Sequence, residues 1–453
     1  MNPKQSSRSV SPARRRAYDI LFRVEMERAY ASVLAAALAE PNLSREDRAL
    51  AQEIVLGVLR WQRSLDYFIE RYSGRPINRF DLPVLIALRI GLYQLRFLDR
   101  IPQSAAVNES VNLVKRARAA SAGGLVNAVL RKAASNLAEK AGEGIADPLE
   151  RASVELSHPR WMLERWQAAL GDEETRQLAL ANNAPAPTAF RVNTLRTTVN
   201  QAITQLKAEG VMTRESELAP GAFIAESGPS SIIAQAAQRG LIYVQDQASQ
   251  LVSILLDPRS GHRVLDLCAA PGSKSSHIAT LTEGKAWVIA CDRHPQRLNS
   301  LRATCQRLGI DSVDALALDA TEMLPFEEGA QKFDRVLVDA PCSGTGTLRG
   351  NPEIKWRLSP DDITRLSKLQ LSLLERAASS VGSAGRLVYS TCSMEREENE
   401  EVVYRFLQSG APFRALKPTA RSDVITSDSF VRTFPHRQGT DGFFAAVLEK
   451  VRS

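Results

Sequence analysis

The chain has 453 residues, of which 44% are hydrophobic and 24% are charged. At roughly 150 residues per domain, this length predicts two to four domains, and the ordinary composition excludes a disordered, collagen-like or coiled-coil protein. No apolar run approaches the roughly 18 residues that a membrane-spanning helix needs. We therefore expect a chain that makes no contact with a membrane.

Positive charge is concentrated in the first third of the chain. The whole sequence carries 58 Lys and Arg residues against 51 Asp and Glu residues, a net charge of +7. Residues 1–150 contain 23 basic and 16 acidic side chains, whereas the rest of the chain contains 35 of each. A clustered positive surface attracts a polyanion through counterion release, although arginine-rich helices also serve only to solvate a surface. Charge alone leaves nucleic-acid binding open.

Five cysteines lie at positions 268, 291, 305, 342 and 392, without a CxxC pair or a histidine cluster. This pattern argues against a zinc site and against a disulfide framework. It predicts reduced thiols in the cytoplasm and no bound metal. Residues 1–16 hold five basic side chains and no acidic one, and we interpret them as a basic flexible arm rather than a transit peptide because they lack an apolar face.

Residues 17–140 show the periodicity of helices. Apolar side chains recur every three or four residues, as at Leu50, Ile54 and Val58. Proline and glycine interruptions divide the segment into five to seven short helices. We expect a compact all-α bundle, and the helices alone do not say whether it is a binding module or a scaffold.

Residues 141–257 have a different sequence pattern, and they begin with a segment that is typical of a linker, GEGIADP. Short predicted strands alternate here with predicted helices. The strands are expected at 188–192, 223–225 and 241–244, and the helices at 159–170 and 201–209. This alternation predicts a small α+β unit.

Residues 258–453 contain continuous apolar runs separated by helical stretches. The runs lie at 264–267, 287–291, 335–338 and 386–389. Strands that are apolar on both faces are typical of a parallel sheet covered on both sides. We therefore expect a doubly wound, Rossmann-like α/β domain, with a last, antiparallel strand at 442–448.

The first motif that carries chemistry is VLDLCAAPGSK at 264–274. A strand ends there in an acid and opens through small residues into a helix near Ser273. Small side chains let a ligand lie against the backbone and the helix N-terminus. Asp292 ends the next strand, where a carboxylate can accept both hydroxyls of a ribose. The arrangement indicates a nucleoside site, and neither GxGxxG nor P-loop spacing follows the first strand.

Two further motifs bring thiols to the ends of later strands. DAPCSGTG at 339–346 and STCSMEREENEEVV at 390–403 place Asp339, Cys342 and Cys392 at the edge where open α/β sheets bind ligands. A single buried cysteine is usually inert. Two thiols at two strand ends, one of them beside an acid, favour a catalytic role. We interpret the other three cysteines as structural, although Cys268 lies in the cofactor turn, where contact with the ligand is an open alternative.

A thiol near a nucleoside cofactor suits methylation of carbon 5 of a pyrimidine. That carbon is too electron-poor to attack an alkyl donor until a thiolate adds to carbon 6. Only a few per cent of an ordinary thiol is ionised near pH 7, so the site should supply positive charge or a helix N-terminus. Asp339 can hold the ring by N3 and the exocyclic amine, and a second thiol can assist removal of the carbon-5 proton. This chemistry does not say which cysteine plays which part.

The motifs VLDLCAAPGSK, DAPCSGTG, STCSMEREENEEVV and PHRQGTDGFFAAVLEK resemble successive motifs of the RNA cytosine-C5 methyltransferases of the Nol1/Nop2/Sun family. The segments DRALAQEIVLGVLRW, IPQSAAVNESVNLVKR and GLVNAVLRKA resemble the RNA-binding domain of the antitermination factor NusB. Their fusion is similar to bacterial 16S ribosomal RNA methyltransferases of the Sun (Fmu) type, over nearly the whole chain. The main departure is Ser273, where many relatives carry a second glycine.

The resemblance implies that S-adenosylmethionine is the methyl donor, with Cys392 as the nucleophile and Cys342 aiding product release. It places Asp292 on the ribose, Asp319 near the adenine, and Asp339 near the methyl donor and the base. The cofactor-binding residues that it implies are Cys268, Ala269, Ala270, Pro271, Gly272, Ser273, Lys274, Asp292, Asp319 and Asp339.

Two neighbouring residues have supporting roles in this interpretation. Asp266 is expected to orient the cofactor loop, and Lys274 either biases a nearby thiol toward its anion or is a solvated lysine at a helix start. The expected partner is 16S ribosomal RNA, free or in an early small-subunit particle. The chain is expected to act as a monomer.

Two other functions compete with this hypothesis. A non-catalytic RNA-binding or antitermination-like regulator would use the N-terminal bundle, but RNA binding alone does not require two cysteines at strand ends. A methyltransferase acting on exocyclic amines would carry an Asn or Asp followed by Pro-Pro and an aromatic residue. Asp339 is followed instead by Ala-Pro-Cys, which disfavours that class.

Overall fold

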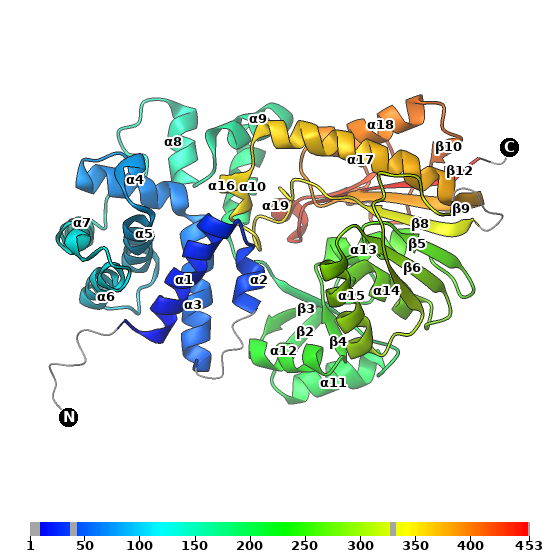
Figure 1. Ribbon diagram of the computed structural model, residues 1–453, viewed down its shortest axis with the longest axis horizontal. Helices are drawn as coiled ribbons and strands as arrows, with labels where there is room; N and C mark the ends of the chain where they lie inside the picture. The colour runs from blue at the N-terminus through cyan, green and yellow to red at the C-terminus, as the bar shows by residue number, and fades with distance from the viewer. Residues whose placement is uncertain (1–9, 37–42, 327–331, 452–453) are drawn as a thin grey trace. The chain divides into compact units, whose positions relative to one another are not determined.

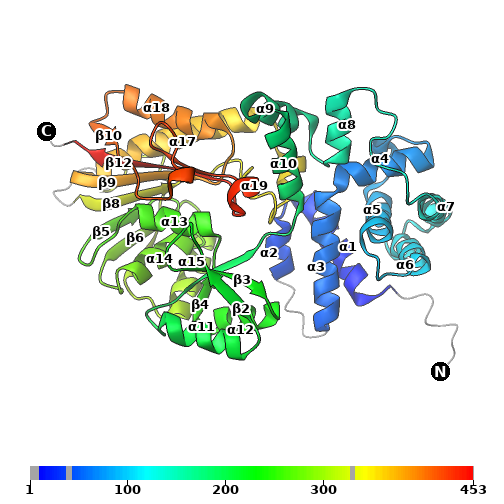
Figure 2. The same cartoon turned by 180° about the vertical axis from the view of Figure 1, so that it is seen from behind.

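The structure is a computed structural model that describes residues 10–36, 43–326 and 332–451. Its chain forms two compact units. We call the first the helical unit, which comprises Met1–Pro185 and Leu348–Arg357, and the second the sheet unit, which comprises Ala186–Thr347 and Leu358–Ser453. Figures 1 and 2 show the elements of both units from opposite sides.

The helical unit is built around α5 (Leu82–Phe97), which is buried along most of its length. A helix that is apolar nearly all round belongs in a core, and α5 packs against five neighbours in the unit. These neighbours are α1 (Pro12–Glu27), α3 (Arg45–Arg60), α4 (Gln62–Ser73), α6 (Gln103–Arg116) and α7 (Gly123–Ser135), and α2 (Ala31–Ala36) packs on α1. The predicted helical bundle is confirmed. Helix α1 begins at Pro12, earlier than the expected Ala17, because proline is favoured in the first turn of a helix.

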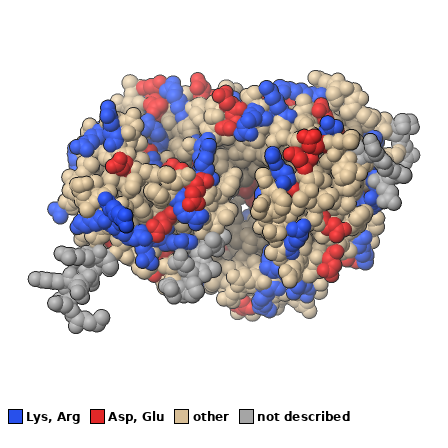
Figure 3. All heavy atoms as spheres, in the orientation of Figure 1, with Lys and Arg blue, Asp and Glu red and all other residues tan. Residues whose placement is uncertain are grey.

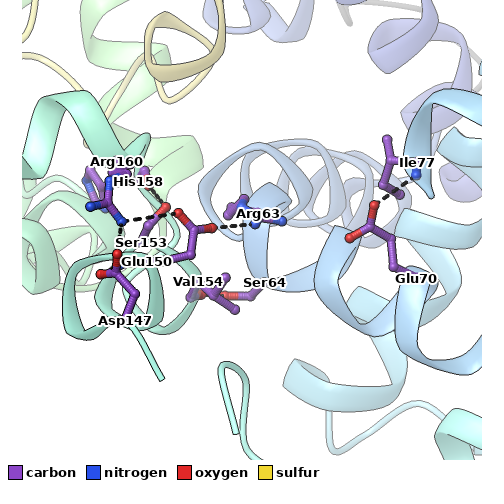
Figure 4. Close-up of polar contacts among 10 residues, drawn as sticks. All are labelled: Arg63, Ser64, Glu70, Ile77, Asp147, Glu150, Ser153, Val154, His158 and Arg160. Carbon is purple, nitrogen blue, oxygen red and sulfur yellow. Dashed lines mark hydrogen bonds and ion pairs between the residues drawn. The ribbon is translucent and has the colours of Figure 1, made fainter. Parts of the chain in front are cut away.

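Three helices beyond residue 141 also belong to the helical unit. They are α8 (Pro148–Glu155), α9 (Arg160–Leu170) and α10 (Asp172–Asn183). Figure 4 shows how α8 is joined to α4: Ser64 Oγ donates a hydrogen bond to Val154 O, and Arg63 Nη2 pairs with Glu150 Oε1 at 2.7 Å. The small sheet therefore starts later than the predicted α+β segment, and the regular elements within residues 141–185 are these three helices.

The helical unit also includes Leu348–Arg357, a segment far from the rest of it in sequence. Short helix α16 (Ile354–Arg357) lies here. Lys355 Nζ donates hydrogen bonds to Arg60 O and Ser157 O at 2.8 Å and to Asn183 Oδ1 at 3.0 Å. The chain thus leaves the sheet unit after Thr347, is anchored in the helical unit, and returns at Leu358.

The sheet unit begins with a small antiparallel sheet of order β2-β3-β1-β4. Its elements are β1 (Thr188–Val192), α11 (Val199–Ala208), β2 (Met212–Glu215), β3 (Ala222–Ser227), α12 (Ser230–Gln238) and β4 (Ile242–Val244). The predicted α+β character is confirmed for these residues. Strand β2 was not predicted, because it is mostly exposed and carries no apolar run.

The large sheet has the order β10-β12-β9-β8-β5-β6-β7, with β11 paired to β12. Its five strands from β9 to β7 are parallel, and β12 is antiparallel to β9, as predicted. The strands are β5 (Arg263–Asp266), β6 (Trp287–Asp292), β7 (Val313–Ala317), β8 (Phe333–Asp339), β9 (Val381–Thr391), β10 (Phe413–Ala415), β11 (Val431–Thr433) and β12 (Phe443–Lys450). Edge strand β7 escaped prediction because it is largely exposed rather than continuously apolar.

Helices cover both faces of this sheet (Figures 1 and 2). Successive residues of a strand point to opposite faces, so Val264 packs in the core under α13 and α14, whereas Leu265 packs in the core under α17 and α18. The covering helices are α13 (Gln247–Leu255), α14 (Ser273–Leu281), α15 (Pro295–Leu308), α17 (Pro360–Ser380) and α18 (Glu400–Gln408), and α19 (Pro435–Gln438) precedes β12. The doubly wound α/β domain is confirmed. No helix in the described ranges is both long and apolar enough to cross a membrane.

Candidate active site

The predicted site residues gather where the parallel strands end. Asp266, Asp292 and Asp339 are the last residues of β5, β6 and β8, and Cys392 directly follows β9. Parallel neighbouring strands end at the same edge of a sheet, which is the edge where such sheets bind ligands. The topology therefore brings together residues that lie up to 126 positions apart.

The turn between β5 and α14 has the form expected of a cofactor loop. Gly272 has φ +102°, and a Cβ there would lie 3.0 Å from Leu301 Cγ, so this position requires glycine. Helix α14 begins at Ser273, and no side chain caps its N-terminus. The N–H groups of its first turn are thus available to an anionic group. Serine at 273 is the first helical residue and leaves the turn intact.

Asp292 is tied to this turn. Its Oδ1 accepts a hydrogen bond from His294 N at 2.9 Å, and its Oδ2 lies 3.2 Å from Arg297 Nη1. Arg297 also donates to Ala270 O at 2.8 Å. One guanidinium therefore joins the carboxylate at the end of β6 to the backbone of the cofactor loop.

Asp319 lies apart from the other carboxylates, in the loop after β7. Its side chain is 40% exposed, and its Oδ1 accepts hydrogen bonds from the N–H and the hydroxyl of Thr321 at 3.0 and 2.6 Å. These hydrogen bonds lower the pKa of Asp319. Its Oδ2 is 3.9 Å from Arg293, the residue after Asp292. Asp319 thus neighbours the end of β6 and makes no described hydrogen bond or ion pair with Asp339.

Lys274 and Asp339 form an ion pair inside the site. Lys274 is buried, and its Nζ lies 2.6 Å from Asp339 Oδ2. Ser390 Oγ donates to Asp339 Oδ1 at 2.8 Å. Burial opposes the charge of Lys274, but the neighbouring carboxylate outweighs it, so the pKa of Lys274 is raised. The alternative of a solvated lysine at the helix start is therefore wrong.

The two predicted catalytic thiols touch. Cys342 Sγ and Cys392 Sγ are 3.3 Å apart, and both residues are half-buried. The contact with Cys392, together with burial, raises the pKa of Cys342 well above its ordinary value. Lys274, by contrast, interacts electrostatically with Cys392. The two sulfurs therefore occupy unlike surroundings.

The other cysteines have surroundings that suit packing. Cys291 and Cys305 are buried, and burial raises the pKa of Cys305 to about 11. Burial, and then the carboxylates of Asp266, Asp339 and Asp292, raise the pKa of Cys268 well above its ordinary value. A thiol that stays protonated is a poor nucleophile, as expected of structural cysteines.

Sequence reasoning missed a polar network that joins the two cysteine loops. Glu398 accepts hydrogen bonds from Ser343 and Ser393, the residues that directly follow Cys342 and Cys392. The serine after each cysteine is the one sequence signal that could have suggested it.

Sequence reasoning also missed Arg191, which reaches from β1 to α14. Its guanidinium is fully buried and donates to Ser276 Oγ at 2.8 Å and to Thr280 Oγ1 at 3.3 Å. Burial lowers the pKa of Arg191 to about 9. This contact fixes the small sheet against the helix that begins at the cofactor loop, and no sequence pattern indicated it.

Together these residues can support covalent addition to an electrophilic ring. A nucleoside-type cofactor fits the glycine turn and the carboxylate that ends β6, and the Lys274–Asp339 pair offers hydrogen-bonding groups beside two thiols. Among the described residues, no group of three His, Cys, Asp or Glu side chains is arranged to hold a metal ion. The chemistry offered by these side chains is nucleophilic and acid–base.

Three family models match the chain. They are "16S rRNA methyltransferase RsmB/F" over residues 253–449, the "NusB family" over residues 11–135, and an "RsmF/B-like, ferredoxin-like domain" over residues 158–230. The three matches together span most of the chain, in the order that the sequence motifs predicted.

Curated relatives and a solved structure match nearly the full length. A probable ribosomal RNA small subunit methyltransferase B of Bacillus subtilis (strain 168) is 35% identical over 440 residues, covering 96% of this chain and 98% of that protein. A protein of the same description from Synechocystis is 36% identical, covering 97% and 99%. The crystal structure of PH0851 superposes with a TM-score of 0.85 at 31% identity, covering 98% of this chain and 99% of that one.

Proposed function

Because this chain belongs to the RsmB/F family of 16S ribosomal RNA methyltransferases, we propose that it methylates carbon 5 of a cytosine in 16S ribosomal RNA. The methyl donor would be S-adenosylmethionine. The observation that carries the proposal is the pair of sulfurs 3.3 Å apart, beside the Lys274–Asp339 ion pair. Cytosine-C5 chemistry needs a nucleophilic thiol and benefits from a second one, and an amine methyltransferase needs neither.

The cofactor loop fits the proposed donor. The predicted loop residues 268–274 surround a glycine turn whose helix is uncapped by any side chain, so its N–H groups can receive the donor's carboxylate. Asp292 would hold the ribose hydroxyls and Asp319 would lie near the adenine. Asp266, buried behind the loop, receives a hydrogen bond from Ser275 Oγ at 2.7 Å and would support the loop rather than touch the donor. When bound, the donor supplies an electrophilic methyl group.

The first covalent step would join Cys392 to the target base. The Cys392 thiolate forms a bond to carbon 6 while the electron pair of the C5=C6 bond shifts through carbon 4 toward N3. Asp339 would hold N3 and the exocyclic amine, and Lys274 keeps its carboxylate in place. Carbon 5 then has the electron density to form a bond to the methyl carbon, and the donor's sulfur retains the pair of the broken bond.

The second covalent step would release the product. Cys342 would first give up its own proton to solvent and then, as a thiolate, accept the proton from carbon 5, while the electrons of that C–H bond restore the C5=C6 double bond. The bond between carbon 6 and Cys392 breaks, and Cys392 leaves as a thiolate. The contact between the sulfurs supports this division, because a base for the carbon-5 proton must lie near the carbon-6 adduct.

The rest of the chain would position the RNA. We propose that residues 17–140 and 141–257 bind RNA and that 258–453 carry the chemistry; residues 12–16 of the predicted arm belong to α1, and residues 1–9 lie outside the described residues. Figure 3 shows basic side chains gathered over α1 and α6, where Lys115 and Arg116 lie in the last turn of α6. Such a surface attracts phosphates without reading sequence. The enzyme would act as a cytoplasmic monomer on free RNA or on an early particle.

Two cysteine variants test the function. Cys392→Ala should bind S-adenosylmethionine within about twofold of wild type but lose methyl transfer by about a thousandfold or more, since the nucleophile is gone. Cys342→Ala should accumulate a covalent RNA adduct that survives denaturing electrophoresis. Donor binding is measured by calorimetry, and bisulfite mapping of small-subunit RNA locates the methyl group.

Three results would count against the proposal. Methylation of carbon 5 by Cys392→Ala would show that Cys392 is not the nucleophile. Normal turnover by Cys342→Ala, without accumulation of an adduct, would show that Cys342 is not needed for product release. No binding of S-adenosylmethionine to the wild-type chain would favour the non-catalytic RNA-binding regulator instead.

A further inference from the structure

A carboxylate that sequence analysis did not assign lies between the two cysteine loops. Glu398 ends the short helix Arg396–Glu398 and is fully buried. Its Oε1 accepts hydrogen bonds from Ser343 N at 2.8 Å and from Gln370 Nε2 at 2.9 Å. Its Oε2 accepts hydrogen bonds from the hydroxyls of Ser343 and Ser393. All four acceptor positions of an ionised carboxylate are thus occupied.

These four donors come from both sides of the thiol pair. Ser343 follows Cys342, and Ser393 follows Cys392. Gln370 Nε2, from α17, bridges Glu398 to Pro341 O, the carbonyl before Cys342, at 2.9 Å. The carboxylate therefore accepts two hydrogen bonds from the Cys342 loop, both from Ser343, and one from the Cys392 loop, from Ser393.

Other hydrogen bonds also join the two loops directly. Gly346 N donates to Cys392 O at 2.9 Å, and Met394 N donates to Thr345 Oγ1 at 2.9 Å. The hydroxyls of Ser343 and Ser393 lie 3.0 Å apart. Glu398 accepts hydrogen bonds from both of these hydroxyls, so it ties together the residues next to the two sulfurs.

We propose that Glu398 is a positioning residue that holds Cys342 against Cys392, so that the thiol for product release stays within reach of the covalent adduct. This inference rests on the proposed function, because it assigns a task within that reaction. Glu398 touches neither sulfur and would act through Ser343 and Ser393.

Glu398 also has an electrostatic effect on the same thiol, Cys342. The carboxylate interacts electrostatically with Cys342, and this interaction contributes to the raised pKa of that thiol. One buried carboxylate thus places the second thiol and adds to the causes that raise its pKa.

Glu398→Gln tests the positioning role with little change in volume. The amide cannot accept the two serine hydroxyls at its nitrogen, so the Cys342 loop should loosen. We expect turnover to fall about tenfold or more, with RNA adduct accumulating and the KM for RNA nearly unchanged. Glu401→Gln is the matched control, since Glu401 lies on the surface in α18 and pairs with the exposed Arg405 at 3.4 Å; it should behave like wild type.

A double variant shows whether Glu398 acts through Cys342. In a Cys342→Ala background, Glu398→Gln should slow the reaction by less than about twofold, because the group that it positions is already gone. A full tenfold loss in that background would mean that Glu398 acts independently and would overturn the proposal.

Phenylarsine oxide measures the sulfur contact without RNA or methyl donor. The arsenical forms two As–S bonds with neighbouring thiols, and its oxygen leaves with the two thiol protons as water. Its affinity for Cys342→Ala, which has one of the two thiols, gives the baseline. Relative to this baseline, we expect Glu398→Gln to bind the arsenical about tenfold more weakly than wild type and Glu401→Gln to bind it as tightly as wild type. Unchanged affinity in Glu398→Gln would overturn the positioning role.

These readouts separate the inference from the proposed function. If Cys342→Ala forms no RNA adduct, the release role fails whatever the arsenical shows; if only the arsenical and double-variant results fail, Glu398 is not a positioning residue. Should Glu398→Gln not fold, Ser393→Ala removes a single donor and should shift the same quantities in the same direction by a smaller factor. No shift in Ser393→Ala would then overturn the proposal.

Discussion

Two buried lysines, one in each unit, show how differently the same side chain is used. Lys274 Nζ in the sheet unit lies 2.6 Å from the Asp339 carboxylate. Lys355 Nζ in the helical unit donates hydrogen bonds to the neutral oxygens of Arg60, Ser157 and Asn183. Burial lowers the pKa of Lys355 well below its ordinary value, and the charge of Arg60 adds to this effect. The pKa of Lys274 is raised instead, because its carboxylate outweighs burial.

The difference teaches that burial alone does not mark a catalytic lysine. A cation paired with a carboxylate that is still 28% exposed, as Asp339 is, offers polar groups to a ligand. A cation whose three hydrogen bonds all go to the surrounding fold offers none. Lys274 is thus expected to serve the reaction, and Lys355 to fasten the segment Leu348–Arg357 into the helical unit.

The largest effect is expected from Lys274→Met. Without its cation, Asp339 is no longer held in place, and Cys392 loses the nearby positive charge. We expect methyl transfer to fall about a hundredfold or more, while the midpoint of urea unfolding changes little because Asp339 keeps Ser390 and partial exposure to water. Single-turnover methylation measures the loss. Lys274→Arg, which retains the charge, should recover part of the rate; a Lys274→Met enzyme as fast as wild type would break the comparison.

The opposite result is expected from Lys355→Ala. Three hydrogen bonds disappear, and the buried oxygens of Arg60, Ser157 and Asn183 lose their donor. We expect the free energy of unfolding of the helical unit to fall by about 3 kcal/mol, as measured by urea denaturation. Donor binding and single-turnover rate should stay within about twofold below the unfolding transition. A large loss of rate without loss of stability would mean that Lys355 also belongs to the catalytic machinery.

The predictable part of the fold followed from continuous apolar strands. Asp292 and Asp339 were placed at strand ends because VIAC and RVLV before them are apolar on both faces. The doubly wound sheet and the shared edge followed from that alternation. Edge strands such as β7, whose residues are mostly exposed, lack this pattern and were missed for that reason.

The site was predicted only where a motif lies close in sequence to its strand. Lys274 lies in the first turn of the helix that follows β5, and its proximity to a thiol was one of two open interpretations. The partners of Lys355 lie up to 295 positions away, and nothing in its sequence neighbourhood signals them. Glu398 stands in the acidic run EREENEE, which normally marks a solvated face, so its burial could not be read from composition.

Asp266 is a fully buried carboxyl whose Oδ2 accepts a hydrogen bond from the Ser275 hydroxyl at 2.7 Å. Burial raises the pKa of Asp266 to about 7, against about 3.9 in an unfolded chain. Between these values the folded state binds more protons than the unfolded state, so the stability that this group contributes is complete below about pH 4 and is lost as pH rises through about 7.

From pH 5 to pH 7, the wild-type sheet unit should therefore lose about 2 kcal/mol more of its unfolding free energy than Asp266→Asn does. Urea denaturation at the two pH values measures this difference, and parallel curves for the two proteins would contradict it. Ser275→Ala removes the hydroxyl that favours the charged carboxylate, so the loss of unfolding free energy between pH 5 and pH 7 should become steeper. If Lys274 rather than Ser275 stabilised the charge of Asp266, this substitution would leave that loss nearly unchanged.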